Sequence, residues 1–138
     1  MRIVVVAGQG GGIGRALVEQ LHTEPRLAGA EIICAGTNGI ATSAMLRAGA
    51  MQGATGENAI CVCARSADVI TGPIGIIMKD AMLGEITGAM AEAITSSNAE
   101  RVLIPVTRSH THIAGFTEQP VKQLVEDAVQ KIVKLLGA

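Results

Sequence analysis

The glycines at positions 8–14 constrain the fold more than any other feature, because five of these seven residues are glycine. They lie in the stretch VVVAGQGGGIGRALVEQL. Before them, the β-branched run at 2–7 predicts a buried strand. After them, apolar residues recur at helical spacing from Ile13 to Leu21 and predict a helix. A connecting loop with so few side chains lets the backbone approach another group closely.

This glycine-rich loop is the candidate binding site of the chain. Gly8, Gly12 and Gly14 form the pattern GxxxGxG between the predicted strand and the predicted helix. Without Cβ atoms in the way, the backbone N–H groups at a helix start are accessible to phosphate. We predict that a nucleotide or dinucleotide binds through its phosphates to the following residues: Gly8, Gln9, Gly10, Gly11, Gly12, Ile13 and Gly14. The alternative is that the glycines serve only the tight packing of strand against helix.

The rest of the sequence alternates predicted strands and helices. The strands are predicted at 31–35, 68–71 and 102–106, with residues 112–116 as an antiparallel edge strand. The helices are predicted at 41–48, 57–66 and 81–97 and after Pro120. Strands that alternate with helices in right-handed crossovers build three layers. The predicted fold class is therefore α/β, one domain over 1–138 with a three-layer, doubly wound, mostly parallel sheet of about five strands, Rossmann-like or flavodoxin-like.

Two further glycine-bearing loops extend the candidate site. In a doubly wound sheet, ligands lie beyond the carboxyl ends of the strands. Gly36 and Gly72 stand where the second and third predicted strands end, as Gly8 does for the first. The predicted site is completed by six residues: Gly36, Thr37, Asn38, Gly72, Pro73 and Ile74. Thr37 and Asn38 either hydrogen-bond a ribose or cap the helix that follows them.

The glycine-rich loop resembles the cofactor loop of short-chain dehydrogenases over residues 8–17, down to the letters GIGRAL. The resemblance implies NAD, NADP or another nucleotide as the ligand. Those enzymes work through a Tyr and Lys pair, and this chain contains no tyrosine that could take the proton-donor role. In addition, no Asp or Glu ends the second predicted strand to bind a ribose 2′-OH, and Gly11 stands where a basic residue often meets a 2′-phosphate.

A second resemblance extends through most of the chain. It is carried by the stretches GQGGGIG, GTNGIATSAMLRAGA, GATGENAI, GPIGII and MLGEIT. In these the chain resembles an uncharacterised family of short bacterial proteins known only as a domain of unknown function. The resemblance supports the α/β fold and implies no activity.

The cysteines and histidines do not predict a metal site. Cys34, Cys61 and Cys63 include no CxxC pair, and we expect reduced thiols that line the core. His110 and His112 have a metal-ligand spacing in an extended segment, but no Cys, Asp or Glu close in sequence completes a site. We therefore predict that the chain binds no metal.

Three charged residues remain as candidates for a binding or catalytic role. Arg108 follows the fourth predicted strand and either meets a phosphate or carboxylate or lies in a solvated turn. Glu57 and Glu85 each neighbour a glycine and are the remaining acid/base candidates. The sequence pairs neither carboxylate with a partner, so no catalytic residue is assigned.

Composition limits the partners of the chain. The formal net charge is −1 and no basic run is present, which argues against nucleic acid and anionic membranes. No apolar run approaches the ~20 residues that span a bilayer, and no signal peptide is recognisable, so we expect a cytoplasmic protein. Charged residues make up only 17 % of the chain, and the segment 74–83 is largely apolar. Both observations favour a homo-oligomer.

Three hypotheses for the function follow. The first is a small nucleotide-binding protein that acts as a sensor or an accessory subunit. The second is a homo-oligomeric structural or scaffold protein that binds no ligand and uses its glycines for packing. The third is an oxidoreductase-type subunit whose catalytic groups come from another chain.

Overall fold

The chain forms a parallel β-sheet with helices on both of its faces. The structure is a computed structural model and describes residues 1–106 and 110–137. The strands are β1 (Arg2–Ala7), β2 (Glu31–Gly36), β3 (Gln52–Thr55), β4 (Val69–Pro73) and β5 (Glu100–Ile104). The helices are α1 (Gly12–Thr23), α2 (Gly39–Ala48), α3 (Glu57–Ser66), α4 (Gly88–Ser96) and α5 (Val121–Leu135), with 3-10 turns η1 (Pro25–Leu27) and η2 (Ile74–Ile77). All strand pairs are parallel, in the order β3-β2-β1-β4-β5, which confirms the predicted fold class.

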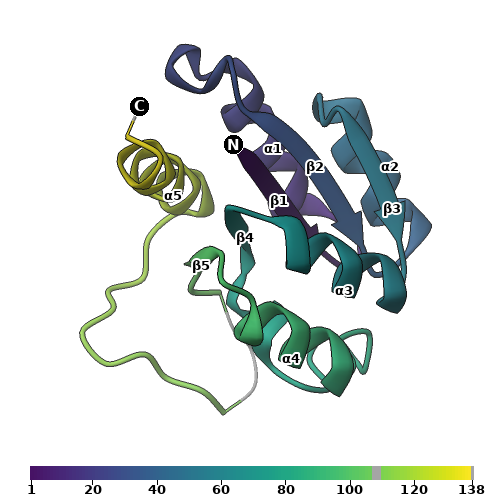
Figure 1. The fold of residues 1–138 in the computed structure, drawn as a ribbon. Coiled ribbons are helices and arrows are strands. Elements are labelled where there is room, and N and C mark those ends of the chain that lie inside the picture. Colours follow the sequence, from purple (N-terminus) through teal and green to yellow (C-terminus); the bar gives the residue numbers. More distant parts are fainter. Residues whose placement is uncertain (107–109, 138) are drawn as a thin grey trace.

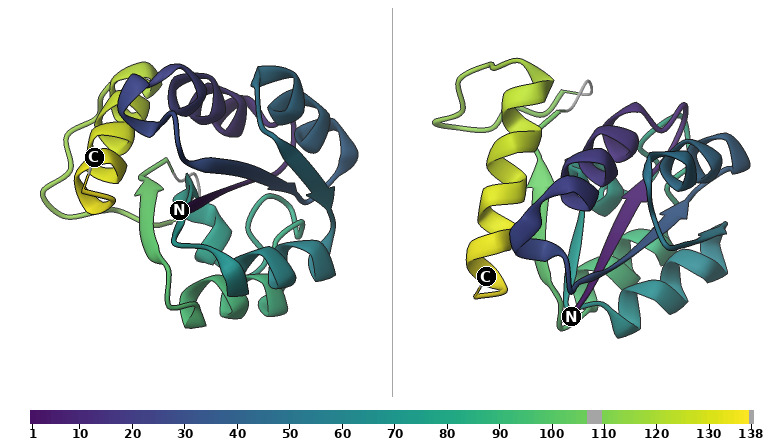
Figure 2. Two further views of the ribbon diagram at one scale, coloured as in Figure 1. Left: turned by 45° about the horizontal axis from the view of Figure 1, so that its top comes forward. Right: turned by 90° about the horizontal axis from the view of Figure 1, so that it is seen from above.

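The three layers are visible in Figure 1 and Figure 2. In the left view of Figure 2, α1, α2 and α5 lie on one side of the sheet, and α3 and α4 lie on the other. Each side has its own buried apolar cluster, with Leu17 and Val125 in the first and Ile60 and Ile94 in the second. Strand β1 contributes to both clusters because successive strand residues point to opposite faces. Its residues 3–7 are therefore all buried.

The strand order reverses beside β1, and this brings together loops from the two halves of the chain. The chain runs outward from β1 through β2 to β3, and α3 then returns it to β4 on the other side of β1. The backbones of β1 and β4 leave no room for a side chain at Gly72, where a Cβ atom would lie 2.2 Å from the carbonyl oxygen of Val6. The loops after β1, β2 and β4 border the edge where doubly wound sheets bind ligands.

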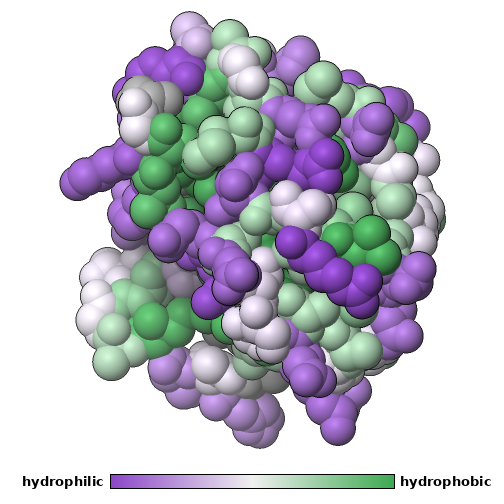
Figure 3. Space-filling model, in the orientation of Figure 1, coloured by the Kyte–Doolittle hydropathy of each residue, from purple (hydrophilic) through white to green (hydrophobic). Residues whose placement is uncertain are grey.

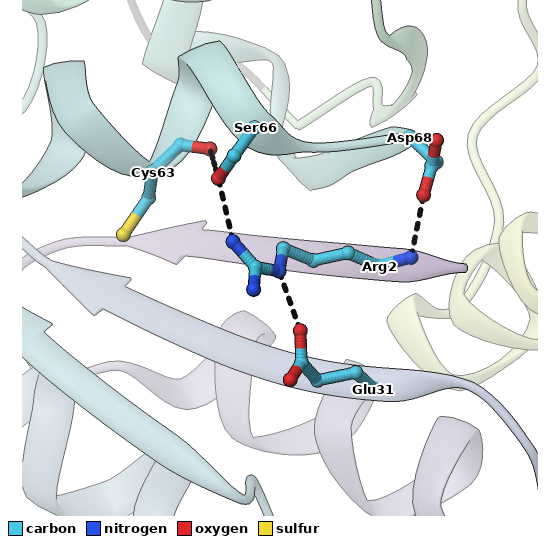
Figure 4. Close-up of polar contacts among 5 residues, drawn as sticks. All are labelled: Arg2, Glu31, Cys63, Ser66 and Asp68. Carbon is cyan, nitrogen blue, oxygen red and sulfur yellow. Dashed lines mark hydrogen bonds and ion pairs between the residues drawn. The ribbon is translucent and has the colours of Figure 1, made fainter.

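At the opposite edge of the sheet, Arg2 joins the starts of three strands (Figure 4). Its Nε pairs with the carboxylate of Glu31 at the start of β2, and its Nη1 donates to Oγ of Ser66 at 2.7 Å. The backbone N–H of Arg2 donates to Oδ2 of Asp68, just before β4, also at 2.7 Å. These contacts fix the register of β1 against its neighbours at the amino ends of the strands.

The assignment of the fifth strand from sequence is wrong. Residues 112–116 were predicted to be an antiparallel edge strand, but Gly115 has φ +78° and Phe116 N–H bonds to the carbonyl of Ile113, which is a turn. The fifth strand is instead β3, which the sequence analysis missed. Its sequence QGAT shows no apolar alternation because β3 lies at the sheet edge and is mostly exposed. The predicted turn at Arg108 lies outside the described residues.

The helix predicted over 81–97 begins later than expected, at Gly88. Its N-cap is Thr87, whose Oγ1 accepts the N–H of Met90. The preceding residues 78–86, which we call the crossing segment, form successive turns. Within it Asp80 and Leu83 have positive φ, which no helix tolerates. The remaining predicted helices and strands are present, with ends shifted by a few residues.

The apolar segment 74–83 is partly covered by the rest of the molecule. Ile76 is fully buried, whereas Leu83 is fully exposed, and the other apolar side chains of this segment are half-buried. The apolar surface that this segment presents to solvent is therefore smaller than the sequence suggests, and Leu83 is its one fully exposed apolar side chain among the described residues. None of the described helices combines the length and the apolar character needed to cross a membrane.

Candidate functional site

The loop between β1 and α1 is a tight turn in which helix N–H groups have no acceptor among the described residues. The N–H of Gly11 donates to the carbonyl of Gly8 at 2.9 Å, and Gly11 has the left-handed φ of +75°. Gly11 is also the N-cap of α1 and has no side chain to accept a helix N–H. Among the described residues, none accepts a hydrogen bond from the N–H of Gly12 or Ile13. The first turn of α1 carries no acidic residue, so its positive end is not neutralised there.

Two glycines of this loop are explained by packing inside the protein. A Cβ atom on Gly11 would lie 2.8 Å from Cα of Ala41 in α2, and one on Gly14 would lie 2.6 Å from Cβ of Ala7. Distances below 3 Å are not found for real Cβ atoms, so a side chain at either position would force the backbone apart. These glycines hold α1 close to α2 and to the sheet.

Two other glycines of the loop face open space. A Cβ atom on Gly10 or on Gly12 would meet no atom within 4 Å. Both residues are exposed, and Gly12 is the first residue of α1. Internal packing among the described residues therefore does not account for glycine at these two positions.

The carboxylate of Glu85 lies against the first two loops. Its Oε1 accepts the backbone N–H of Gln9 at 2.8 Å, Nδ2 of Asn38 at 3.0 Å, and the hydroxyl of Thr37. These donors, led by Thr37 and then Gln9, hold the pKa of Glu85 below its ordinary value, because they stabilise the charged form. Glu85 is therefore ionised at neutral pH and acts only as a hydrogen-bond acceptor.

The crossing segment carries Glu85 to this position. It follows η2 after β4, and its turns are closed by hydrogen bonds from Asp80 N–H to the carbonyl of Ile86 at 2.7 Å and from Ile86 N–H to the carbonyl of Ala81 at 3.2 Å. Ile86 is fully buried and anchors the segment in the second apolar cluster. Met82 lies so close to Gly8 that a Cβ atom there would be 2.6 Å from its sulfur.

In the loop after β2, Asn38 caps helix α2. Capping is one of the two roles that the sequence allows for this residue. Its Oδ1 accepts the N–H of Ala41 at 2.9 Å, and Asn38 is the N-cap of α2. Its Nδ2 also donates to the carbonyl of Gln9 at 2.9 Å, which joins the first loop to the second. Gly36 has no room for a side chain, because a Cβ atom would lie 2.3 Å from Oγ1 of Thr42.

A shallow depression adjoins the second loop at the start of α2. It is lined by Asn38, Gly39, Ile40, Ser43 and Arg47. Ile40 is 71 % exposed there and presents an apolar side chain to solvent. Asn38 belongs both to this depression and to the donors around Glu85.

The third predicted loop contributes differently from the first two. Gly72 and Pro73 are buried within β4, and Ile74 is half-buried at the start of η2. After β4, the residue that contributes to the site is Glu85, in the crossing segment. From the sequence, Glu85 is only an unpaired acid/base candidate, because no local pattern indicates that it contacts residues 48 and 76 positions earlier.

Glu57 and the cysteines make no hydrogen bond with Glu85 or its three donors among the described residues. Glu57 accepts the hydroxyl of Thr87 at 2.6 Å. Burial raises the pKa of Cys34 to about 11 and also raises that of Cys63. In the part of the chain that the structure describes, no three His, Cys, Asp or Glu side chains lie close enough to hold a metal ion.

The comparisons with known proteins identify a family without a known activity. A family model described as a domain of unknown function, DUF3842, matches residues 2–137, so the chain belongs to that family. No curated protein matches the chain. The function must therefore be inferred from the geometry of the site.

Proposed function

We propose that this member of the DUF3842 family binds a nucleotide or dinucleotide through its phosphates at loop 8–14, as a sensor or an accessory subunit. One observation carries the proposal. The N–H groups of Gly12 and Ile13 lack acceptors among the described residues, and the absence of side chains at Gly10 and Gly12 leaves the space before them open. A helix start with free N–H groups and an unobstructed approach suits a phosphate group.

The contact between Gln9 and Glu85 supports the same proposal. It shows that a backbone N–H of this loop is oriented to bind an anionic oxygen. The N–H groups of α1 lie beyond this contact in the chain and are not used by the carboxylate. We infer that phosphate binds over Gly10 and Gly12, where α1 contributes its positive end.

The resemblance of residues 8–17 to a dehydrogenase cofactor loop makes NAD and NADP the first candidates for the ligand. No tyrosine is present to serve as the proton donor of those enzymes. We therefore propose binding without assigning a reaction. An oxidoreductase-type role would require catalytic groups from another chain.

A homo-oligomeric scaffold is the second candidate function, favoured by the exposed apolar side chains near the β3 edge. Ile40 at the start of α2 and Met51 just before β3 are 71 % and 66 % exposed. On the face drawn in Figure 3, apolar residues gather in several separate areas between hydrophilic ones. Self-association through the exposed side of β3 would cover an open sheet edge.

A thermal-shift screen tests the proposed ligand. We would use NAD, NADP, their reduced forms, ATP, GTP, FMN and coenzyme A. A ligand at ~100 times its Kd stabilises the fold by about 2.7 kcal/mol, which raises the Tm by several degrees in a domain of this size. Gly12→Val should fold but lose the shift, because its side chain enters the open space before α1.

The matched control is Gly29→Val, since a Cβ atom on Gly29 also meets no atom within 4 Å and the residue lies far from the loop in sequence. This variant should keep the full ligand shift. If no nucleotide shifts the wild type, or if Gly12→Val binds as tightly as Gly29→Val, phosphate binding at this loop is wrong. Light scattering on the same samples then decides for or against the scaffold, which requires a mass above that of the 14.1 kDa monomer.

A further inference from the structure

We propose that Glu85 is the ribose-binding carboxylate of this site, and that it selects a ligand with a free 2′-OH over a ligand with a 2′-phosphate. The inference rests on the proposed nucleotide binding and adds to it a specificity-determining residue. Nothing in the sequence around Glu85 indicates this role. The structure indicates it by bringing Glu85 to the end of β2.

The position of Glu85 is the first argument. In nucleotide-binding sheets of this kind, an acidic residue after the second strand accepts the ribose hydroxyls. Here β2 ends at Gly36, and the next residue, Thr37, is not acidic. The hydroxyl of Thr37 instead donates to the carboxylate of Glu85. The crossing segment thus supplies, from the other half of the sheet, the carboxylate that the second strand lacks.

The unused oxygen of the carboxylate is the second argument. The donors from Gln9, Thr37 and Asn38 all bind Oε1. Within residues 1–106 and 110–137, none donates to Oε2. Three donors fix the orientation of the carboxylate, and Oε2 keeps its lone pairs for hydroxyl donors. A 2′-OH can donate to such an oxygen, whereas a 2′-phosphate cannot and would be repelled by its charge.

The order of the neighbouring groups is the third argument. Through Gln9, Glu85 touches the glycine-rich loop, where we place the phosphates. Through Asn38, it adjoins the depression that Ile40 and Arg47 line. Phosphate, ribose and base follow one another in a nucleotide. The loop, the carboxylate and the depression follow one another in the same order, and the depression offers the apolar side chain of Ile40 to the flat face of a base.

A different role for Glu85 would be to occupy the phosphate position itself and block it. The contacts favour the ribose role. The carboxylate accepts a hydrogen bond from the N–H of Gln9, but the N–H groups of Gly12 and Ile13 have no acceptor among the described residues. The helix start, which is the strongest part of an anion site, therefore stays open while Glu85 is in place.

Calorimetric titration with paired ligands tests the inference. The probes are NAD against NADP and ATP against 2′-deoxy-ATP, on wild type, Glu85→Gln and the control Glu57→Gln. The wild type should bind the 2′-OH member of each pair about 10-fold to 100-fold more tightly, as expected for one hydrogen bond to a charged group. Glu85→Gln should lose most of this preference, through weaker binding of NAD and ATP and, for NADP, also through loss of the charge repulsion. Glu57→Gln should keep it, because Glu57 accepts its hydrogen bond from Thr87, which is not a donor to Glu85.

The possible failures can be told apart. If none of the four probes binds the wild type, the ribose role is overturned, and phosphate binding is overturned with it only if the wider nucleotide screen also gives no thermal shift. If probes bind but the wild type takes NADP as tightly as NAD, the ribose role alone is overturned, and this result does not depend on any variant folding. If Glu85→Gln raises the affinity for all four ligands by the same factor, Glu85 blocks the phosphate position and the ribose role is wrong.

Discussion

Arg2 and Glu85 lie at opposite ends of the same sheet, and the chain surrounds them differently. At the amino ends of the strands, the guanidinium of Arg2 pairs with a carboxylate and a hydroxyl of its own chain (Figure 4). At the carboxyl ends, the carboxylate of Glu85 is held by uncharged donors only, and no described cationic side chain pairs with it.

The difference separates a structural use of charge from an arrangement suited to a ligand. Charged side chains that pair with each other stabilise the fold and have few hydrogen-bonding positions left for a ligand. No described residue donates to the second oxygen of the Glu85 carboxylate or accepts from the first N–H groups of α1, so this edge keeps hydrogen-bonding capacity within the described part of the chain. The amino edge therefore fastens the strands, and the carboxyl edge is the place to look for a ligand.

The largest effect is expected where backbone packing shapes the carboxyl edge. Gly72→Ala should lower the free energy of unfolding by about 3 kcal/mol, because the new Cβ would lie 2.2 Å from the carbonyl oxygen of Val6 and the two strand backbones cannot yield cheaply. Gly12→Ala places its Cβ in open space and should stay within about 1 kcal/mol of wild type. Urea unfolding followed by circular dichroism measures both. If Gly72→Ala and Gly12→Ala lower the free energy of unfolding equally, the distinction between packed and open glycines at this edge is wrong.

A smaller effect is expected at the amino edge. Arg2→Ala removes the contacts to Glu31 and Ser66, and we expect a loss of about 1 kcal/mol, limited because the Arg2 and Glu31 side chains are 37 % and 39 % exposed. Ligand binding should be unchanged. Lys131→Ala, which breaks an exposed pair with Asp127 within α5, should cost less than about 0.5 kcal/mol. A weakened ligand shift in Arg2→Ala would contradict the separation of the two edges.

The smallest effect concerns the pH dependence of stability. The fold lowers the pKa of Glu85, so its carboxylate stabilises the folded state above the pKa that it has in the unfolded chain. This contribution is lost as the pH falls through the lowered pKa. The difference in unfolding free energy between wild type and Glu85→Gln should therefore be larger at about pH 7 than at about pH 3. A difference that does not change with pH would mean that the contacts of Glu85 do not favour its charged form.

The sequence predicts the fold well where apolar patterning is strong. The buried run of β1 and the helical spacing of α1 are clear because each buries its apolar residues in one of the two clusters. Strand β3 is missed because an exposed edge strand needs no apolar alternation. Residues 112–116 contain apolar letters that suggest a strand, but Gly115 turns the backbone there.

The candidate site is only partly predictable for a related reason. The glycine-rich loop is local in sequence and is recognisable from its spacing. The contact of Gln9 with Glu85 joins residues 76 positions apart and depends on how the crossing segment folds back from β4. Left-handed conformations at Asp80, Met82 and Leu83 direct this return. Aspartate adopts a positive φ more often than most residues, but methionine and leucine seldom do, so the sequence does not indicate this path.

The distance in sequence between Gln9 and Glu85 also has a consequence for synthesis. The first 56 residues contain β1, α1, β2, α2 and β3, and with them the glycine-rich loop and Asn38. The carboxylate arrives only after α3 and β4 have been made and β4 has docked beside β1. As the chain leaves the ribosome from its N-terminus, the two loops of the first half precede the carboxylate that completes the site. A nascent chain halted before residue 85 would lack the group to which we assign recognition of the 2′-OH.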